Sequence, residues 1–127
     1  MSIYKKGPKG KLDAIFSLFI RTRDKWTCRK CGKPQPFKSR GYHCAHMRGR
    51  KNESLRWDER NAFGMCYGCH SFIDSNPHDK EAWYVSQFGQ EAWDNLVLLS
   101  NQSAHLKEWQ VLEMIETYEK KLAEISN

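Results

Sequence analysis

The 127-residue sequence lacks any apolar run that approaches the roughly 20 residues needed to cross a bilayer. Its first residues, MSIYKKGPKGK, are basic, but no apolar segment with a small-residue cleavage site follows them. The start of the sequence therefore does not have the pattern of a secretory signal. These absences argue against a membrane-spanning or exported protein, and we expect a cytoplasmic location.

Acidic residues are scarce in the first half of the sequence, and arginine is absent from the second half. Residues 1–60 contain 17 Lys and Arg against 5 Asp and Glu, a balance of +12. Residues 61–127 contain 4 Lys against 10 Asp and Glu, a balance of −6, which leaves a formal net charge of +6. A basic half of this size is typical of proteins with a polyanionic partner. A solvated basic surface has the same composition, but the basic half also contains the motif described below, which favours DNA as the partner.

Four of the five cysteines form two Cys-x-x-Cys pairs, Cys28 with Cys31 and Cys66 with Cys69. This pattern is typical of two zinc knuckles that complete one tetrahedral site for structural Zn²⁺. Without an export signal, metal binding is favoured over disulfides. Redox chemistry or free thiols are the less favoured interpretation. Cys44 is left over, and we interpret it as a small buried apolar residue.

Three polar residues stand in a fixed order around the second cysteine pair. His46 and Asn61 precede it, and His70 follows Cys69 directly, which is the order of the HNH nuclease motif. Hydrolysis of a phosphodiester needs a base for the attacking water and a cation for the charge that develops on the phosphate. We predict His46 as the base, because imidazole is largely neutral at pH 7. We predict Asn61 as the residue that orients the base and His70 as a ligand of a catalytic Mg²⁺ or Mn²⁺. A lone histidine is more often structural, so the prediction depends on all three residues together.

The length predicts one domain, and the pattern of elements predicts the α+β class. Its expected parts are a basic arm (1–10), a helix (11–25), a zinc-bound core (26–75) and a helical scaffold (76–127). The arm is expected to end before the first helix because Gly7, Pro8 and Gly10 interrupt helices. The core is expected to contain a strand at 41–47 and a helix that starts at the second cysteine pair.

The scaffold is predicted to contain three helices. Asn76 and Pro77 have the pattern of a helix start, and Gly89 has the pattern of its end. A second helix is expected at 91–100. Ser103 is expected to cap a third helix, at about 104–125, whose length leaves a homodimer open.

Four basic residues flank the predicted base and are expected to contact DNA phosphates. They are Arg48, Arg50, Lys51 and Arg56.

Several longer segments resemble a known family. They are LDAIFSLFIRTRDKWTCRKCG, AHMRGR, LRWDERNAFGMCYGCH and FGQEAWDNLVLLS, with the helix that follows. These segments are similar to the NinG/Rap recombination nucleases of lambdoid phages, an HNH-type group. The resemblance implies a ββα-metal finger, a divalent catalytic metal, and cleavage of branched recombination DNA in the cytoplasm of a host cell. By matching position it also implies the roles given above for His46, Asn61 and His70.

Two positions depart from the pattern of these enzymes. His70 stands where the family often has Asn, and both side chains bind divalent metals. Ala45 stands where many HNH enzymes place an Asp or His ligand before the base, so the metal is one ligand short. Side chains alternate along a strand, so His43 shares the face of Ala45, and we expect His43 to supply the missing ligand. The alternative is a Mg²⁺ held by one protein ligand, waters and phosphate oxygens.

Ala45 also favours a second hypothesis, a non-catalytic zinc-finger protein that binds nucleic acid. A third hypothesis is a small phage-type regulator that binds a host protein through its acidic helices. A nuclease cuts DNA, a binding module shifts DNA on a gel without cutting it, and a regulator does neither.

Overall fold

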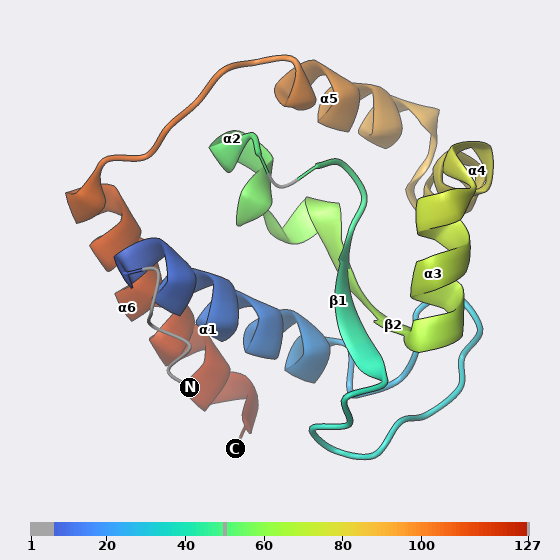
Figure 1. Ribbon diagram of the computed structural model, residues 1–127, viewed down its shortest axis with the longest axis horizontal. Coiled ribbons are helices and arrows are strands. Elements are labelled where there is room, and N and C mark those ends of the chain that lie inside the picture. Colours follow the sequence, from blue (N-terminus) through green and yellow to red (C-terminus); the bar gives the residue numbers. More distant parts are fainter. Residues whose placement is uncertain (1–6, 50, 127) are drawn as a thin grey trace.

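The computed structural model describes residues 7–49 and 51–126 (Figure 1). Its elements are α1 (Gly7–Arg23), β1 (Tyr42–His46), α2 (Glu53–Arg56), the 3-10 turn η1 (Glu59–Asn61), β2 (Ala62–Cys66), α3 (Tyr67–Ser75), α4 (Pro77–Phe88), α5 (Gln90–Ser100) and α6 (Glu108–Ser126). The fold is therefore a mostly helical α+β fold with one two-stranded sheet. No helix in the described part of the chain is long and apolar enough to cross a membrane.

The sheet is an antiparallel hairpin of β1 and β2. Its register pairs Tyr42 with Cys66 and His46 with Ala62. The long connection between the strands holds α2 and η1. In Figure 1, α1 and α6 lie on one side of the hairpin and α3 and α4 on the other, whereas α5 lies at the top of the view, near α2 and α4. Helices cover both faces of the hairpin. The outer edge of β2 is hydrogen-bonded to residues beyond α1, because the Gly64 carbonyl accepts the Arg29 N–H and the Gly64 N–H donates to Asp24.

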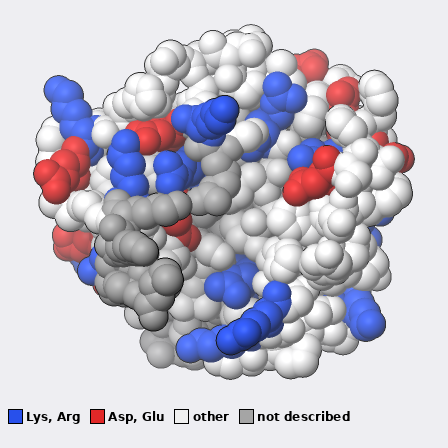
Figure 2. Space-filling view, viewed as in Figure 1, with Lys and Arg blue, Asp and Glu red and all other residues white. Residues whose placement is uncertain are grey.

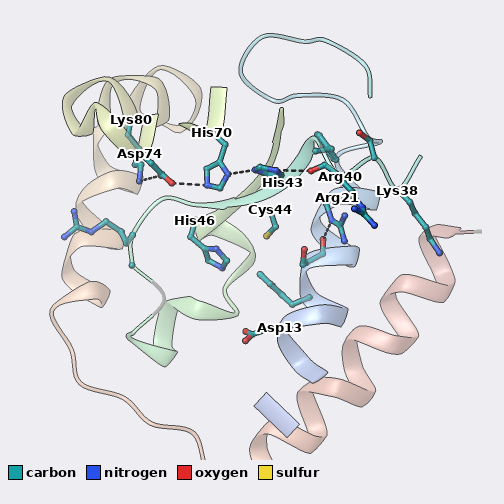
Figure 3. A pocket seen from close by; sticks show the side chains of 16 residues that line it. Asp13, Arg21, Lys38, Arg40, His43, Cys44, His46, His70, Asp74 and Lys80 are labelled. Carbon is teal, nitrogen blue, oxygen red and sulfur yellow. Dashed lines mark hydrogen bonds and ion pairs between the residues drawn. The ribbon is translucent and has the colours of Figure 1, made fainter. Parts of the chain in front are cut away.

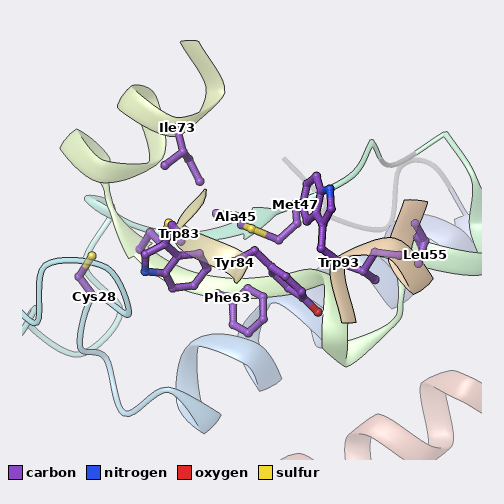
Figure 4. Packing of buried hydrophobic residues seen from close by; sticks show 11 residues of the cluster. Cys28, Ala45, Met47, Leu55, Phe63, Ile73, Trp83, Tyr84 and Trp93 are labelled. Atoms are coloured by element: carbon purple, nitrogen blue, oxygen red, sulfur yellow. The ribbon is translucent and has the colours of Figure 1, made fainter. Parts of the chain in front are cut away.

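Two apolar cores occupy these two sides. The first, here called the α3–α5 core, is shown in Figure 4. It contains Cys28, Ala45, Met47, Leu55, Phe63, Met65, Ile73, Trp83, Tyr84, Trp93 and Leu96. The second, the α1–α6 core, contains Leu12, Phe16, Phe19, Ile20, Trp57, Ala62, Val111, Ile115 and Tyr118. Ala45 and Met47 point into the first core, whereas Cys44 packs against the second, as the alternation of a strand requires.

The expected boundary between the arm and the first helix is wrong. Helix α1 begins at Gly7 rather than at residue 11. Pro8 lies in the first turn, where a backbone N–H has no helical partner and proline is tolerated. The side chain of Lys9 also pairs with Glu53, which holds this turn against α2. Residues 1–6 of the predicted arm lie outside the described residues.

The ends of other elements also differ from expectation. Helix α1 ends at Arg23, because Lys25 and Trp26 adopt left-handed backbone conformations with φ of 58° and 54°. The last helix begins at Glu108 rather than near residue 104, so Ser103 does not cap it. The side-chain oxygen of Gln110 instead accepts the backbone N–H of Lys107 at 2.8 Å, just before the helix. The helix predicted between Pro77 and Gly89 is confirmed as α4.

Candidate functional site

The four cysteines of the two Cys-x-x-Cys pairs converge on one point. Their sulfur atoms all lie within 4.8 Å of one another, and the Sγ atoms of Cys31 and Cys66 are 3.8 Å apart. Zn–S bonds of about 2.3 Å at tetrahedral angles separate two sulfurs by about 3.8 Å. The cluster of Cys28, Cys31, Cys66 and Cys69, here called the four-cysteine cluster, is therefore suitable for a structural zinc ion.

The backbone around Cys28 favours its thiolate form. Burial alone would raise the pKa of Cys28, but N–H groups of Cys31, Cys66 and Lys30 lower it to about 7. The N–H of Cys31 lies 3.4 Å from the Cys28 sulfur. These N–H groups favour the thiolate of Cys28, which is the form that binds zinc, whereas burial and the neighbouring thiols raise the pKa of Cys69.

The four-cysteine cluster also fixes the position of α3. Cys66 is the last residue of β2, and Cys69 lies in the first turn of α3. A metal bound by both would hold the end of the hairpin to the start of the helix. His70 follows Cys69 directly, so its backbone position depends on the same cluster.

A cavity of about 670 Å³ lies beside β1 (Figure 3). Its lining residues are Asp13, Phe16, Ser17, Arg21, Lys38, Ser39, Arg40, Tyr42, His43, Cys44, His46, Arg48, Gly49, His70, Asp74 and Lys80. They come from α1, β1, α3, α4 and the neighbouring loops, and none comes from β2. The cavity therefore lies along the edge of β1 that does not pair with β2, and side chains from both faces of the strand reach it. In this way His43 from one face and His46 from the other line the same cavity.

His46 is held by the connection between the strands. Its Nε2 lies 3.1 Å from the backbone oxygen of Arg56. A carbonyl oxygen only accepts hydrogen bonds, so Nε2 carries the proton in the neutral ring and Nδ1 is the basic nitrogen. The ring of Phe16 lies beside the imidazole, with 6.4 Å between the ring centres. These contacts fix both the tautomer and the direction of the predicted base.

Asn61 is fully buried and connects the two parts of the chain that position His46. Its Oδ1 accepts the backbone N–H of Arg48 at 2.8 Å. Its Nδ2 donates to the backbone oxygens of Arg48 and Leu55, at 3.2 and 3.1 Å. Arg48 follows the strand of His46, and Leu55 precedes Arg56, whose carbonyl accepts a hydrogen bond from the Nε2–H of His46. The contacts of Asn61 are therefore those expected of a residue that orients His46.

The rings of His43 and His70 meet in the cavity. Their Nδ1 atoms are 2.8 Å apart. The Nε2 of His43 lies 3.1 Å from the backbone oxygen of Arg40, and the Nε2 of His70 lies 3.1 Å from a carboxylate oxygen of Asp74. The other oxygen of Asp74 pairs with Lys80 at 3.1 Å. Figure 3 shows this chain of contacts from Lys80 to Arg40.

The surroundings keep the His70 ring in its neutral form. Burial lowers the pKa of His70; the Asp74 carboxylate opposes this shift, whereas His43 and Lys80 add to it. A neutral imidazole is the form that binds a metal.

The described arginines fall into two groups. Four pair with aspartates: Arg23, Arg29, Arg56 and Arg60. The other three, Arg21, Arg40 and Arg48, have no carboxylate within salt-bridge distance among residues 7–49 and 51–126. All three line the cavity, so unpaired positive charge is concentrated at this site.

The four basic residues predicted to contact DNA differ in their surroundings. The guanidinium of Arg48 contacts the Ser100 hydroxyl and lies 5.7 Å from the centre of the Trp93 ring. The guanidinium of Arg56 donates two hydrogen bonds, of 3.0 and 2.5 Å, to the carboxylate of Asp13. Lys51 lines a second cavity of about 620 Å³, which shares Arg48 with the first. Arg50 lies outside the described residues.

Some cavity residues were not predicted from the sequence. Arg21, Lys38, Arg40 and Lys80 add positive charge, and Figure 2 shows Lys and Arg side chains over the segment that joins α1 to β1. Asp74 had a signal in the sequence, because a residue four positions after His70 lies on the same face of a helix. Arg21 also had a signal, because it lies in the basic end of the first helix, which can reach a DNA backbone. Lys38, Arg40 and Lys80 lie outside the motifs and had none. Cys44 was expected to be buried, but it is half-buried and lines the cavity.

Comparisons with known proteins identify the family. Searches of curated proteins and of solved structures gave no match. A family model described as bacteriophage lambda NinG protein matches residues 5–127. The match covers nearly the whole chain, and the chain therefore belongs to the NinG family of phage proteins.

Proposed function

We propose that this protein is a metal-dependent DNA endonuclease of the HNH type, with β1, β2 and α3 as its ββα-metal finger. The observation that carries the proposal is the meeting of His43, His46 and His70 in one cavity. Three arginines of the same cavity have no carboxylate partner among the described residues. The chain belongs to a family of phage proteins, and the resemblance described above implies a role in DNA recombination. The proposed substrate, branched recombination DNA, rests on the resemblance described above.

The chemistry begins with a water molecule beside the Nδ1 atom of His46. His46 takes a proton from this water as its oxygen attacks the phosphorus atom. The bond from phosphorus to the leaving sugar oxygen then breaks, and that oxygen receives a proton from solvent. Because Nε2 donates to the Arg56 carbonyl, the imidazolium that forms keeps a partner for its second proton.

Charged residues around the cavity bind and orient the phosphate. Arg21, Arg40 and Arg48 can donate to its oxygens because no carboxylate in the described chain neutralises them. His43 and His70 would hold the divalent metal. A bound metal would stabilise the negative charge that develops on the phosphate.

The position of Ala45 explains why no metal ligand stands directly before His46. Its side chain is fully buried in the α3–α5 core, in the same cluster as Ile73 of α3. An acidic residue there would be taken out of water, at a large cost in free energy. His43 reaches the neighbourhood of His70 from the same strand face, so the lack of a ligand atom at Ala45 does not argue against catalysis.

Plasmid nicking tests the proposal. With the zinc-loaded protein and an added divalent metal, supercoiled plasmid is expected to become nicked. His46→Ala should lower the single-turnover cleavage rate by roughly 10²–10⁴, the range typical of a general base, with little change in DNA affinity. His105→Ala, at an exposed histidine between α5 and α6, is the matched control and should cleave normally. DNA binding by the unaltered protein without cleavage under any metal would support the non-catalytic hypothesis instead.

A further inference from the structure

The Nε2 atoms of His43 and His70 both face groups that accept hydrogen bonds. The backbone oxygen of Arg40 cannot donate, and the carboxylate of Asp74 accepts when ionised. Each neutral ring therefore carries its proton on Nε2 and has a lone pair on Nδ1. The two Nδ1 lone pairs point at each other across 2.8 Å, an arrangement that is repulsive without a cation between them.

This arrangement has the form of a metal centre with its supporting groups. Metal-binding histidines typically donate their other N–H to a carboxylate or a backbone carbonyl, which fixes the tautomer and ring orientation. His70 has the carboxylate of Asp74, and His43 has the carbonyl of Arg40. Lys80 pairs with the second oxygen of Asp74 and keeps that carboxylate in place.

The donor set consists of imidazole nitrogens. Within residues 7–49 and 51–126, the four-cysteine cluster is the only group of three or more His, Cys, Asp or Glu residues whose ligand atoms converge. No carboxylate therefore joins the two Nδ1 atoms, and Asp74 approaches the opposite edge of the His70 ring. Water or phosphate oxygens would complete the coordination.

Imidazole ligands discriminate between divalent metals. Mg²⁺ prefers oxygen ligands and gives up its waters reluctantly. Imidazole suits zinc, copper, iron and nickel, and affinity rises from Mn²⁺ through Co²⁺ to Ni²⁺. We infer that the His43–His70 centre selects nitrogen-preferring transition metals such as Co²⁺, Ni²⁺ or Zn²⁺ over Mg²⁺, and that Asp74 is the positioning residue that presents the His70 nitrogen. This inference concerns the metal of the nuclease proposed above, but its test needs no cleavage.

Calorimetric titration of the zinc-loaded protein with NiCl₂, MnCl₂ and MgCl₂, in the absence of DNA, tests the metal preference. The zinc content is measured after each titration, to show that the four-cysteine cluster keeps its metal. Ni²⁺ should bind more tightly than Mn²⁺, and Mn²⁺ more tightly than Mg²⁺. His43→Ala and His70→Ala should each abolish the tight Ni²⁺ site, whereas His105→Ala should leave it unchanged. Mg²⁺ binding as tight as that of Ni²⁺, or Ni²⁺ binding unaffected by His43→Ala, would overturn the inference.

The role of Asp74 is tested by comparing the effect of Asp74→Asn on Ni²⁺ binding with and without His70. Asp74→Asn should weaken Ni²⁺ binding by roughly 10–100-fold, the usual effect of removing an outer-shell partner. In the His70→Ala background, Asp74→Asn should have no further effect on the residual binding. A further loss in that background would assign Asp74 a separate role, as a direct ligand or a structural residue, and contradict the positioning role. Tight, His43-dependent metal binding without plasmid nicking would leave this inference standing and reject the nuclease proposal.

Discussion

The side-chain oxygen of Asn61 accepts the backbone N–H of Arg48 at 2.8 Å, and the Asn61 amide donates back to the Arg48 carbonyl. These two hydrogen bonds hold together the ends of the segment between β1 and β2. The Arg56 carbonyl, which contacts His46, lies in this segment. Asn61→Ala leaves buried backbone groups without partners, so we expect a loss of about 1–3 kcal/mol in the free energy of unfolding. The cleavage rate should also fall, because His46 loses its fixed direction.

Asn61→Asp separates the two effects of this substitution. Aspartate keeps an oxygen for the Arg48 N–H but has no amide to donate to the carbonyls of Arg48 and Leu55. Chemical denaturation and single-turnover cleavage should both show a defect. A full cleavage rate in either folded variant would show that His46 does not depend on Asn61.

Zinc is expected to hold the fold together. Zinc binding by small domains contributes an apparent ~10–16 kcal/mol at pH 7, which matches the whole stability of a typical domain. Cys28→Ser or Cys66→Ser should therefore give a protein without zinc and without fixed tertiary structure, as measured by metal analysis and near-UV circular dichroism. Cys44→Ser, outside the four-cysteine cluster, should keep its zinc. A well-folded, zinc-free Cys66→Ser protein would contradict the assignment.

The sequence predicted best those features that depend on short spacing. The two Cys-x-x-Cys pairs predicted the four-cysteine cluster, and Pro77 with Gly89 predicted the bounds of α4. Alternation along β1 placed His43 on the side of the hairpin that faces α3. Each of these predictions uses local geometry, which the order of residues determines directly.

Features that depend on tertiary contacts could not be predicted in the same way. Helix α1 starts early because Lys9 meets Glu53, a residue far away in the sequence. Arg56 was expected to contact DNA, but Asp13 of α1 binds its side chain. DNA binding and the role of each site residue stay predictions.

Gly64 is expected to tolerate no side chain. A Cβ atom at this position would lie 1.8 Å from the Tyr42 hydroxyl oxygen and 2.3 Å from the ring carbon that bears it. Tyr42 is buried and donates to the Thr27 carbonyl at 2.9 Å, so its ring cannot easily move. Gly64→Ala should lower the melting temperature markedly. Gly68→Ala is the control, because no atom lies within 4 Å of its added Cβ and alanine favours the helix α3.

DNA binding is expected to depend on the cations that have no acidic partner in the described part of the chain. Each phosphate neutralised contributes about −0.9 to the slope of log affinity against log salt on duplex DNA. Arg48→Ala with Lys51→Ala should flatten this slope and weaken binding to all sequences alike, as measured by fluorescence anisotropy. Arg60→Ala is the matched control, because Asp58 already pairs with that arginine. An unchanged slope in the double variant would locate the DNA on another surface.

Glu53 is expected to make stability depend on pH in the acid range. Burial alone would raise the pKa of Glu53, but the Lys9 ammonium at 2.5 Å and the Leu106 N–H at 2.6 Å lower it below its ordinary value. A carboxyl group with a lowered folded-state pKa stabilises the fold above its unfolded pKa of about 4.3, and this contribution is lost as the pH falls through the folded-state value.

Glu53→Gln should therefore lower the free energy of unfolding by about 1.5–3 kcal/mol at pH 7, the range for hydrogen bonds to a charged group. The difference from the unaltered protein, measured by urea denaturation, should shrink below about pH 4. Since acid also releases zinc from thiolates, Glu119→Gln on the exposed face of α6 serves as the reference. A Glu53→Gln deficit that stays constant down to pH 3 would show that the charge of Glu53 does not contribute.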